Sequence, residues 1–252
     1  MSRSDSNWAN ARRRKDEPRS EAGATTILVV TGLSREAACA KGEDLSTICS
    51  GADFATLRAS LTRLADDNFA AVVSFGLAGG LDYALKPGDV VVGSEAVSGE
   101  RRFAAHPALS HILSEGLANA GGKSVESGVA GVDAPVLDRA AKAELRSKTE
   151  AVAVDMESHL AAAFAAERGI PFAIVRVICD PAARALPPLA MRAIKPDGKV
   201  DLEHVLRELR REPSQIVKLI EAGLDARAAF ASLRRCGRLL GPLLRLGLSD
   251  LR

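Results

Sequence analysis

Short runs of valine, isoleucine, leucine and alanine recur along the chain, separated by stretches that we predict to be helices. The runs occupy residues 27–31, 48–51, 70–75, 90–92, 127–132, 151–157 and 172–178. Such runs are typical of strands that are buried on both faces of a sheet. The predicted helices occupy residues 53–65, 107–120, 138–148 and 158–168. This alternation predicts an α/β fold, a three-layer sandwich with a central mixed, mostly parallel sheet flanked by helices.

Three further segments differ from this alternation. Residues 76–81 are rich in glycine and predict a loop after the strand at 70–75. Residues 1–24 are polar, carry both charge signs and contain no apolar run, so we expect disorder there and no secretory signal. Residues 25–201 form the predicted α/β domain. Residues 202–252 are predicted to form a helical extension of several helices, because glycines and Pro242 interrupt its last part.

Composition narrows the classes of function. The chain has 252 residues, 47% of them apolar, and a formal net charge of +2, which is too small to indicate a nucleic-acid partner. Its four cysteines and four histidines stand at no metal-ligand or redox spacing. We therefore expect a cytoplasmic protein with neither a metal site nor an organic cofactor.

Two acids follow predicted buried strands, Glu157 after residues 151–156 and Asp180 after residues 172–178. The carboxyl ends of parallel strands line the crevice where ligands bind. Two carboxyl groups there suit cleavage of the N-glycosidic bond of a purine nucleoside. Asp180 would give a proton to the departing base, and Glu157 would hold the sugar as it gains positive charge. The alternatives are helix capping by Asp155 or Glu157, and an ordinary turn at Asp180 before Pro181.

Short motifs strengthen the first interpretation. They are Phe-Gly-Leu-Ala-Gly-Gly-Leu at 75–81, Pro-Gly-Asp-Val-Val at 87–91, Val-Asp-Met-Glu-Ser at 154–158 and Val-Arg-Val-Ile-Cys-Asp at 175–180. In order and spacing, residues 27–181 resemble the superfamily of purine nucleoside phosphorylases and methylthioadenosine/S-adenosylhomocysteine nucleosidases. Within it, the start at 29–33 and the glycine segment most resemble the hopanoid-associated phosphorylases, which act on adenosylhopane and release adenine.

The resemblance implies a role for each matching residue and makes residues 25–201 a nucleoside phosphorylase-like catalytic domain. Asp180 would engage purine N7, and Glu36 would help a water molecule to attack the sugar. Met156 and Glu157 would hold the ribose, and the backbone of Val136 would meet the purine edge.

Other matches concern the attacking group and the 5′ end of the nucleoside. Gly32, Gly76 and Ala78 would direct backbone N–H groups toward phosphate or another nucleophile. Phe103 falls in a segment that reaches the 5′ substituent in the family, often across a subunit interface. Packing in a core or an interface is the alternative for Phe103, and solvent exposure is the alternative for the nearby His106.

Departures from the family pattern leave the nucleophile open. Leu77 and Ser74 stand where relatives carry a serine and an arginine for the nucleophile or phosphate, and Cys179 replaces a serine beside Asp180. Positive charge would then have to come from Arg35, Arg101 or Arg102. We expect inorganic phosphate as co-substrate and adenosylhopane as substrate. The alternatives are a nucleosidase that uses water, and a non-catalytic nucleoside-binding or membrane-associated scaffold.

The last residues combine arginine with leucine. From residue 226 onward the chain has six arginines and one acid, a composition that suits a helix on an anionic membrane surface. Packing on the domain or on a partner subunit, with the arginines in solvent, is the alternative. The resemblance also favours a homo-oligomer. Because the expected substrate is apolar, peripheral contact with the inner membrane is a further hypothesis.

Overall fold

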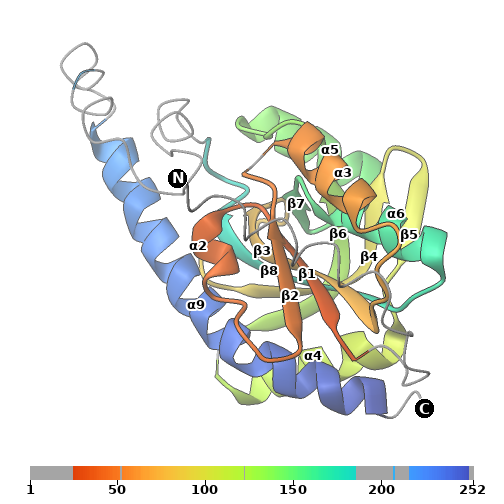
Figure 1. Cartoon of the computed structure of the whole chain (residues 1–252). Coiled ribbons are helices and arrows are strands. Elements are labelled where there is room, and N and C mark those ends of the chain that lie inside the picture. Colours follow the sequence, from red (N-terminus) through yellow and green to blue (C-terminus); the bar gives the residue numbers. More distant parts are fainter. Residues whose placement is uncertain (1–24, 52, 122, 186–206, 208–215, 250–252) are drawn as a thin grey trace, which may run out of the picture.

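The computed structural model describes residues 25–51, 53–121, 123–185, 207 and 216–249 (Figure 1). Its strands are β1 (Ile27–Thr31), β2 (Leu45–Cys49), β3 (Ala71–Gly80), β4 (Val90–Ser98), β5 (Arg101–Ala104), β6 (Ser124–Gly131), β7 (Ala153–Asp155) and β8 (Phe172–Asp180). Its helices are α2 (Ser34–Ala37), α3 (Phe54–Arg63), α4 (Pro107–Asn119), α5 (Arg139–Thr149), α6 (Ser158–Arg168) and α9 (Ile216–Ser249). The segment 1–24, the predicted boundary at residue 201 and, apart from residue 207, the first part of the predicted helical extension (202–215) lie outside the described residues.

The eight strands form one mixed sheet in the order β2-β1-β3-β7-β6-β4-β5, with β8 paired to both β3 and β4. Five of the pairings are parallel, and three are antiparallel: β3 with β7, β4 with β8, and β4 with β5. Because β8 bridges β3 and β4, the strands β3, β8, β4, β6 and β7 close into a ring. The predicted mixed and mostly parallel sheet is confirmed.

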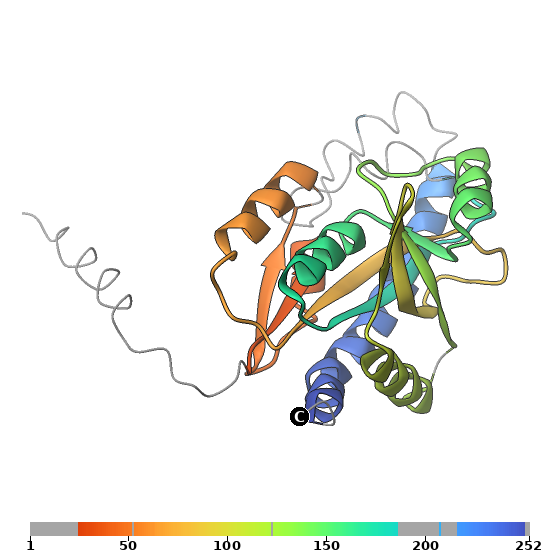
Figure 2. The ribbon, with the colours of Figure 1, turned by 90° about the vertical axis from the view of Figure 1, so that its right-hand side faces the viewer.

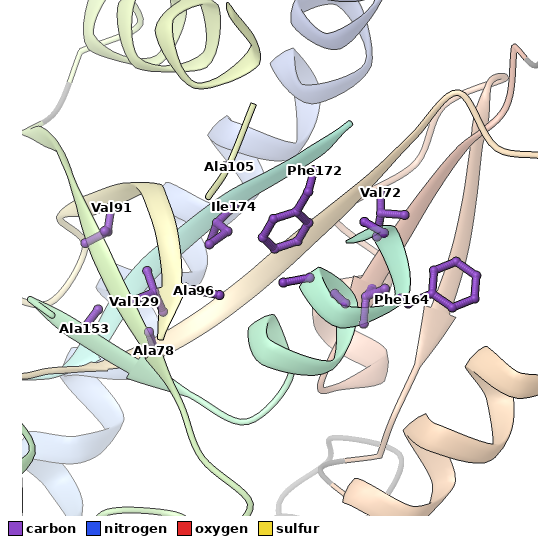
Figure 3. Packing of buried hydrophobic residues seen from close by; sticks show 14 of the residues in the cluster. Val72, Ala78, Val91, Ala96, Ala105, Val129, Ala153, Phe164, Phe172 and Ile174 are labelled. Atoms are coloured by element: carbon purple, nitrogen blue, oxygen red, sulfur yellow. The ribbon is translucent and has the colours of Figure 1, made fainter. Parts of the chain in front are cut away.

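Helices cover both faces of the sheet (Figure 2). One core cluster combines α3 and α6, through Leu57, Leu61 and Phe164, with residues of β3, β4, β6 and β8; Figure 3 shows members of this cluster. A second cluster packs α4 and α9 against the other face, with Leu109 and Phe230 among its members. Burial of apolar side chains on both faces explains why the strands lack a polar alternation.

The glycine-rich residues 76–81 do not form the predicted loop. The strand β3 continues to Gly80, because β8 pairs with it from Val72 to Gly79 and β7 pairs with Gly79 and Gly80. Strands on both sides supply the hydrogen bonds that keep the glycines extended, so tertiary context outweighs their weak strand propensity. The prediction of a loop was therefore wrong.

The C-terminal residues 216–249 form one continuous helix, α9, where several helices were predicted. Its buried face contacts α4 and β8, and Pro242 lies inside it on the exposed side. Gly237 does not interrupt the helix. A Cβ at this position would stand 2.1 Å from the carbonyl oxygen of Cys39, so glycine permits close approach of the two backbones. Packing along the whole helix overrides the breaking tendency of these residues.

The side chains of α9 separate by type. Leu233, Leu240 and Leu244 are buried in the core, while Arg227 and Arg234 are exposed. The leucines that suggested a membrane surface are thus largely used in packing on the domain. None of the described helices combines the length and the apolar composition that crossing a bilayer requires.

Candidate active site

Glu36 lies just beyond β1, on the short helix α2, and its carboxylate is held by three backbone N–H groups. Oε2 accepts hydrogen bonds from the N–H groups of Gly32 and Leu33, both at 2.8 Å, and Oε1 accepts one from Leu77 at 2.9 Å. The side chain is buried, with 3% of the residue exposed. Successive N–H groups pointing at one spot form an anion-binding concavity. Here that concavity is filled by a carboxylate of the same chain.

Glu157 lies near Glu36 and beside Gly32, in the short connection between β7 and α6. A Cβ on Gly32 would stand 2.7 Å from Glu157 Oε1, so a larger residue here would displace the Glu157 carboxyl group. The Ser50 hydroxyl donates to Oε1 at 3.3 Å, and Arg176 Nη1 lies 3.3 Å from Oε2. The ends of β1, β2 and β7 thus meet at one buried point, as their sequence pattern predicts.

The capping question is answered by Asp155. Its Oδ1 accepts a hydrogen bond from the N–H of Ser158 at 3.0 Å, and the Ser158 hydroxyl donates to its Oδ2. Glu157 occupies the N-cap position of α6, but its side chain makes no capping hydrogen bond. Asp155 therefore caps the helix, and the Glu157 carboxylate points to the buried cluster instead.

Arg176, in the middle of β8, joins these acids and was missed by the sequence reasoning. It is fully buried, its Nε lies 2.5 Å from Asp155 Oδ2, and it donates to the Ser74 hydroxyl at 2.5 Å and to the Leu77 carbonyl at 3.3 Å. An arginine within a strand that is otherwise apolar on both faces was the available signal, because a buried charge requires partners. Ser74 binds this guanidinium and is fully buried.

Burial changes the proton affinity of both glutamates. Desolvation raises the pKa of Glu157 to about 7, and the neighbouring carboxylates of Asp155 and Glu36 add to the rise, against the opposing effect of Arg176. Desolvation also raises the pKa of Glu36, although Arg176 and its three N–H partners act in the opposite direction. A carboxyl group whose pKa is raised is suited to acid–base chemistry.

Asp180 lies at the end of β8 beside Gly79, where an added Cβ would stand 3.3 Å from Asp180 Oδ2 and 3.4 Å from Oδ1. Burial raises the pKa of Asp180, while the ammonium of Lys142 lowers it. Lys142 comes from α5, is 1% exposed, and pairs with Asp180 Oδ2. Cys179 keeps its proton, because burial and nearby acids raise its pKa to about 12.

The two parts of the site are separated along β3. Glu36 and Arg176 approach Gly76, whereas Asp180 approaches Gly79. Three residues of strand span roughly 10 Å, a separation that a purine nucleoside can bridge. The site lies over the middle of β3 and at the ends of β1, β2, β7 and β8.

The structure places most of the other predicted residues near these two groups. Ala78 is buried in β3 between the two glycines, and the half-buried Met156 precedes Glu157. Val136 packs against a buried apolar cluster that includes Val154, and Val154 borders Gly79. Ala78 thus lies between the two positions of β3 that Glu36 and Asp180 approach.

Phe103 does not join this cluster within its own chain. It lies on the edge strand β5 and lines a groove of about 560 Å³ together with His106 and Phe172. Phe172 begins β8, and Asp180 ends it, so the groove lies at the opposite end of that strand.

The arginines considered as sources of positive charge are also engaged elsewhere. Arg35 stacks over Phe230 at 4.1 Å, Arg101 stacks over Phe103 at 4.7 Å, and Arg102 pairs with Glu95 at 2.6 Å.

Comparisons with known proteins agree with this fold. The model of the phosphorylase superfamily matches residues 20–220, and no curated protein matches the sequence. Among solved structures, the chain is similar to the 5′-methylthioadenosine/S-adenosylhomocysteine nucleosidase of Helicobacter pylori, with 14% identity, a TM-score of 0.64, and coverage of 88% of this chain and 99% of that one.

Two further solved structures have the same fold. For S-adenosylhomocysteine nucleosidase from Streptococcus pyogenes the identity is 16% and the TM-score 0.64, covering 89% of this chain and 98% of that one. For the nucleosidase of Colwellia psychrerythraea in complex with adenine, the identity is 20% and the TM-score 0.56, covering 63% of this chain and 83% of that one. At these identities the likeness to the solved structures concerns the fold alone. The family model spans most of the sequence, and the chain therefore belongs to the phosphorylase superfamily.

Proposed function

We propose that this protein cleaves the N-glycosidic bond of a purine nucleoside and that water is the attacking group. The observation that carries the proposal is the position of the Glu36 carboxylate on the N–H groups of Gly32, Leu33 and Leu77. Gly32 is one of the residues whose N–H the sequence assigns to phosphate or another nucleophile. With an anion of its own chain already there, a phosphate would have to displace it.

Electrostatics adds to this difficulty. Two unit charges of the same sign about 4 Å apart repel by about 4 kcal/mol at the effective dielectric constant of a protein surface. A phosphate near Glu36 would also meet Glu157, which carries a negative charge above about pH 7, and Arg176 is already paired with Asp155 and Glu157. Water carries no such penalty and can give its proton to Glu36.

The proposed reaction divides the work between the two ends of the site. A water oxygen attacks C1′ of the ribose while its proton passes to Glu36, whose raised pKa favours acceptance. The bond from C1′ to N9 breaks, its electron pair goes to the purine, and Asp180 gives a proton to N7. Glu157, with Met156 beside it, holds the ribose hydroxyls, and the backbone at Val136 meets the purine edge. This chemistry calls for no cofactor.

Phosphorolysis, the reaction after which the superfamily is named, is the second candidate. The two functions differ in one measurement, the rate of adenine release with and without inorganic phosphate. A rate that is unchanged when phosphate is removed, with a free ribose that keeps the 5′ substituent as the second product, supports hydrolysis. The 1-phosphate of that substituted ribose as product supports phosphorolysis. No adenine release from any adenosyl compound would favour a non-catalytic nucleoside-binding scaffold.

For the substrate we propose an adenosine with a large apolar 5′ substituent, with adenosylhopane as the first compound to test. One supporting feature is an exposed apolar stripe on α9 formed by Ile216, Val217, Ile220 and Leu224, each between 48% and 60% exposed. The same end of α9 binds Arg184, which follows Asp180 by four residues. Products from adenosylhopane and from methylthioadenosine, compared by chromatography, test this choice; equal or faster turnover of the small compound would count against it.

Peripheral membrane contact and homo-oligomer formation are further proposals. The exposed arginines of α9, among them Arg227, Arg234 and Arg238, suit contact with anionic headgroups. Phe103 on the edge strand β5 suits a subunit interface. Co-sedimentation with anionic liposomes tests the first proposal, and light scattering tests the second; a monomer that stays in the supernatant would contradict both.

A further inference from the structure

Lys142 is an unusual residue for a helix that covers a sheet, because its long cationic side chain is almost fully buried. Its residue exposure is 1%, whereas Lys148 on the same helix α5 has a side chain that is 69% exposed. Enclosing an ammonium group is costly unless the group is paired and hydrogen-bonded. Lys142 therefore requires partners, and all of its visible partners belong to the segment that begins with Asp180.

The ammonium group of Lys142 has three donors, and each finds an acceptor in this segment. It donates to Asp180 Oδ2, to the Pro181 carbonyl at 3.1 Å and to the Arg184 carbonyl at 3.3 Å. The side chain of Arg184 in turn pairs with Asp225 of α9. The turn after β8 is thus held by α5 on one side and by the C-terminal helix on the other.

The contact is specific to one carboxyl oxygen. Lys142 binds Oδ2, so that Oδ1 of Asp180 is left for another partner. Both oxygens lie beside Gly79, on the path between the two ends of the site. A fixed carboxyl group with one oxygen held and the other available has the orientation that a proton donor to a base needs.

We infer that Lys142 is the positioning residue of the acid, holding Asp180 by Oδ2 and stabilising the carboxylate that forms when Oδ1 gives its proton to the purine. The inference rests on the proposed function. The proton moves from Asp180 to N7 as the bond between C1′ and N9 breaks, and the negative charge left on Asp180 is then neutralised by the ammonium beside it. A charge partner placed in advance stabilises the transition state more than the ground state.

Removal of the Lys142 ammonium group should raise the pKa of Asp180. The charged groups that face Asp180 are Lys142 from α5, Arg184 from the following turn and Asp225 from α9. Lys142 lowers the pKa of Asp180 against the effect of burial. Without it the acid would keep its proton to higher pH, so the alkaline limb of kcat/KM would move upward. A residue that only fills space would leave that limb in place.

The test uses the full chain with methylthioadenosine as probe, over pH 5 to 10. In K142M, kcat should fall about 100-fold, the loss typical of one stabilising donor, and the alkaline limb should rise by about one pH unit or more. The control is K148M, which should match the wild type in both respects. K142R, which keeps the charge, should retain the wild-type limb. An unmoved limb in K142M would overturn the inference.

A double-mutant comparison separates an effect of K142M on Asp180 from a general loss of structure. Once Asp180→Asn has removed the acid, adding K142M should change the rate less than about threefold, because Lys142 then has no carboxylate to stabilise. A further loss near 100-fold in that background would contradict the inference. If the wild type releases no adenine, the proposed function fails separately. The pKa of the Asp180 carboxyl, measured by ¹³C NMR in K142M and wild type, then decides the matter, and equal values would overturn the inference.

Discussion

The buried carboxyl group of Glu157 predicts an unusual dependence of stability on pH. Its pKa is raised from the ordinary 4.5 to about 7, chiefly by burial, with Asp155 and Glu36 adding to the rise and Arg176 and Ser50 opposing it. Between these two values the folded protein holds a proton on Glu157 that the unfolded chain releases. The free energy of unfolding must then fall as pH rises from about 4.5 to 7.

The size of this effect follows from the shift. One pKa unit corresponds to about 1.4 kcal/mol, so a rise from 4.5 to about 7 amounts to about 3 kcal/mol. This contribution is fully present below pH 4.5 and is lost above pH 7. Glutamine keeps the size of the side chain and cannot ionise, so Glu157→Gln should remove the dependence that Glu157 causes.

The assay is urea unfolding of wild type and Glu157→Gln at pH 5, 6, 7 and 8. Other titrating groups are shared by the two proteins, so the difference in unfolding free energy isolates Glu157. That difference should change by about 2.5 kcal/mol between pH 5 and pH 8 in favour of the variant. Glu126→Gln, at an exposed position of β6, is the control and should follow the wild type. Parallel curves for wild type and Glu157→Gln would refute the reasoning.

Four other substitutions have predicted effects. Asp180→Asn should lower adenine release at least 100-fold by product chromatography, and near-wild-type turnover would contradict its role as the acid. Gly76→Ala would place a Cβ 2.7 Å from Arg176 Nη1 and 2.8 Å from Glu36 Oε2, so it should reduce both activity and thermal stability, the latter by about 1–3 kcal/mol; an unchanged melting temperature would count against that contact. Gly237→Ala would place a Cβ 2.1 Å from the Cys39 carbonyl oxygen, so it should lower the urea midpoint. At Gly223 an added Cβ meets nothing within 4 Å, so Gly223→Ala should raise stability by about 0.5–1 kcal/mol. Equal urea midpoints for the two variants would argue against close packing of α9.

The layers of this fold could be predicted because the signal was local. Apolar runs such as 27–31 and 172–178 identify buried strands whatever their partners are. Asp53, the first residue of the helix predicted at 53–65, caps that helix by accepting a hydrogen bond from the Thr56 N–H. The extent of β3 and the continuity of α9 were not predictable in this way. Both depend on partners far along the chain, which supply hydrogen bonds to glycines and packing around Pro242.

In the candidate site too, some residues could be predicted from the sequence and others could not. Glu157 and Asp180 could be found because strand ends and family motifs mark them. Arg176 and Lys142 could not be placed, because their function depends on burial that only the assembled sheet and α5 create. For Glu36 the sequence indicated the residue, and the structure added that its carboxylate is held by N–H groups of two separate segments.

The proposed attack by water on a purine nucleoside is tested most directly by product analysis in phosphate-free buffer. Wild-type protein and Glu36→Gln are incubated with methylthioadenosine and adenosylhopane, each with and without inorganic phosphate, and the sugar product is identified by mass spectrometry. The account predicts adenine and a free ribosyl product at a rate independent of phosphate, with a loss of about 100-fold or more in Glu36→Gln. Adenine release that requires phosphate and yields a ribosyl 1-phosphate would contradict it.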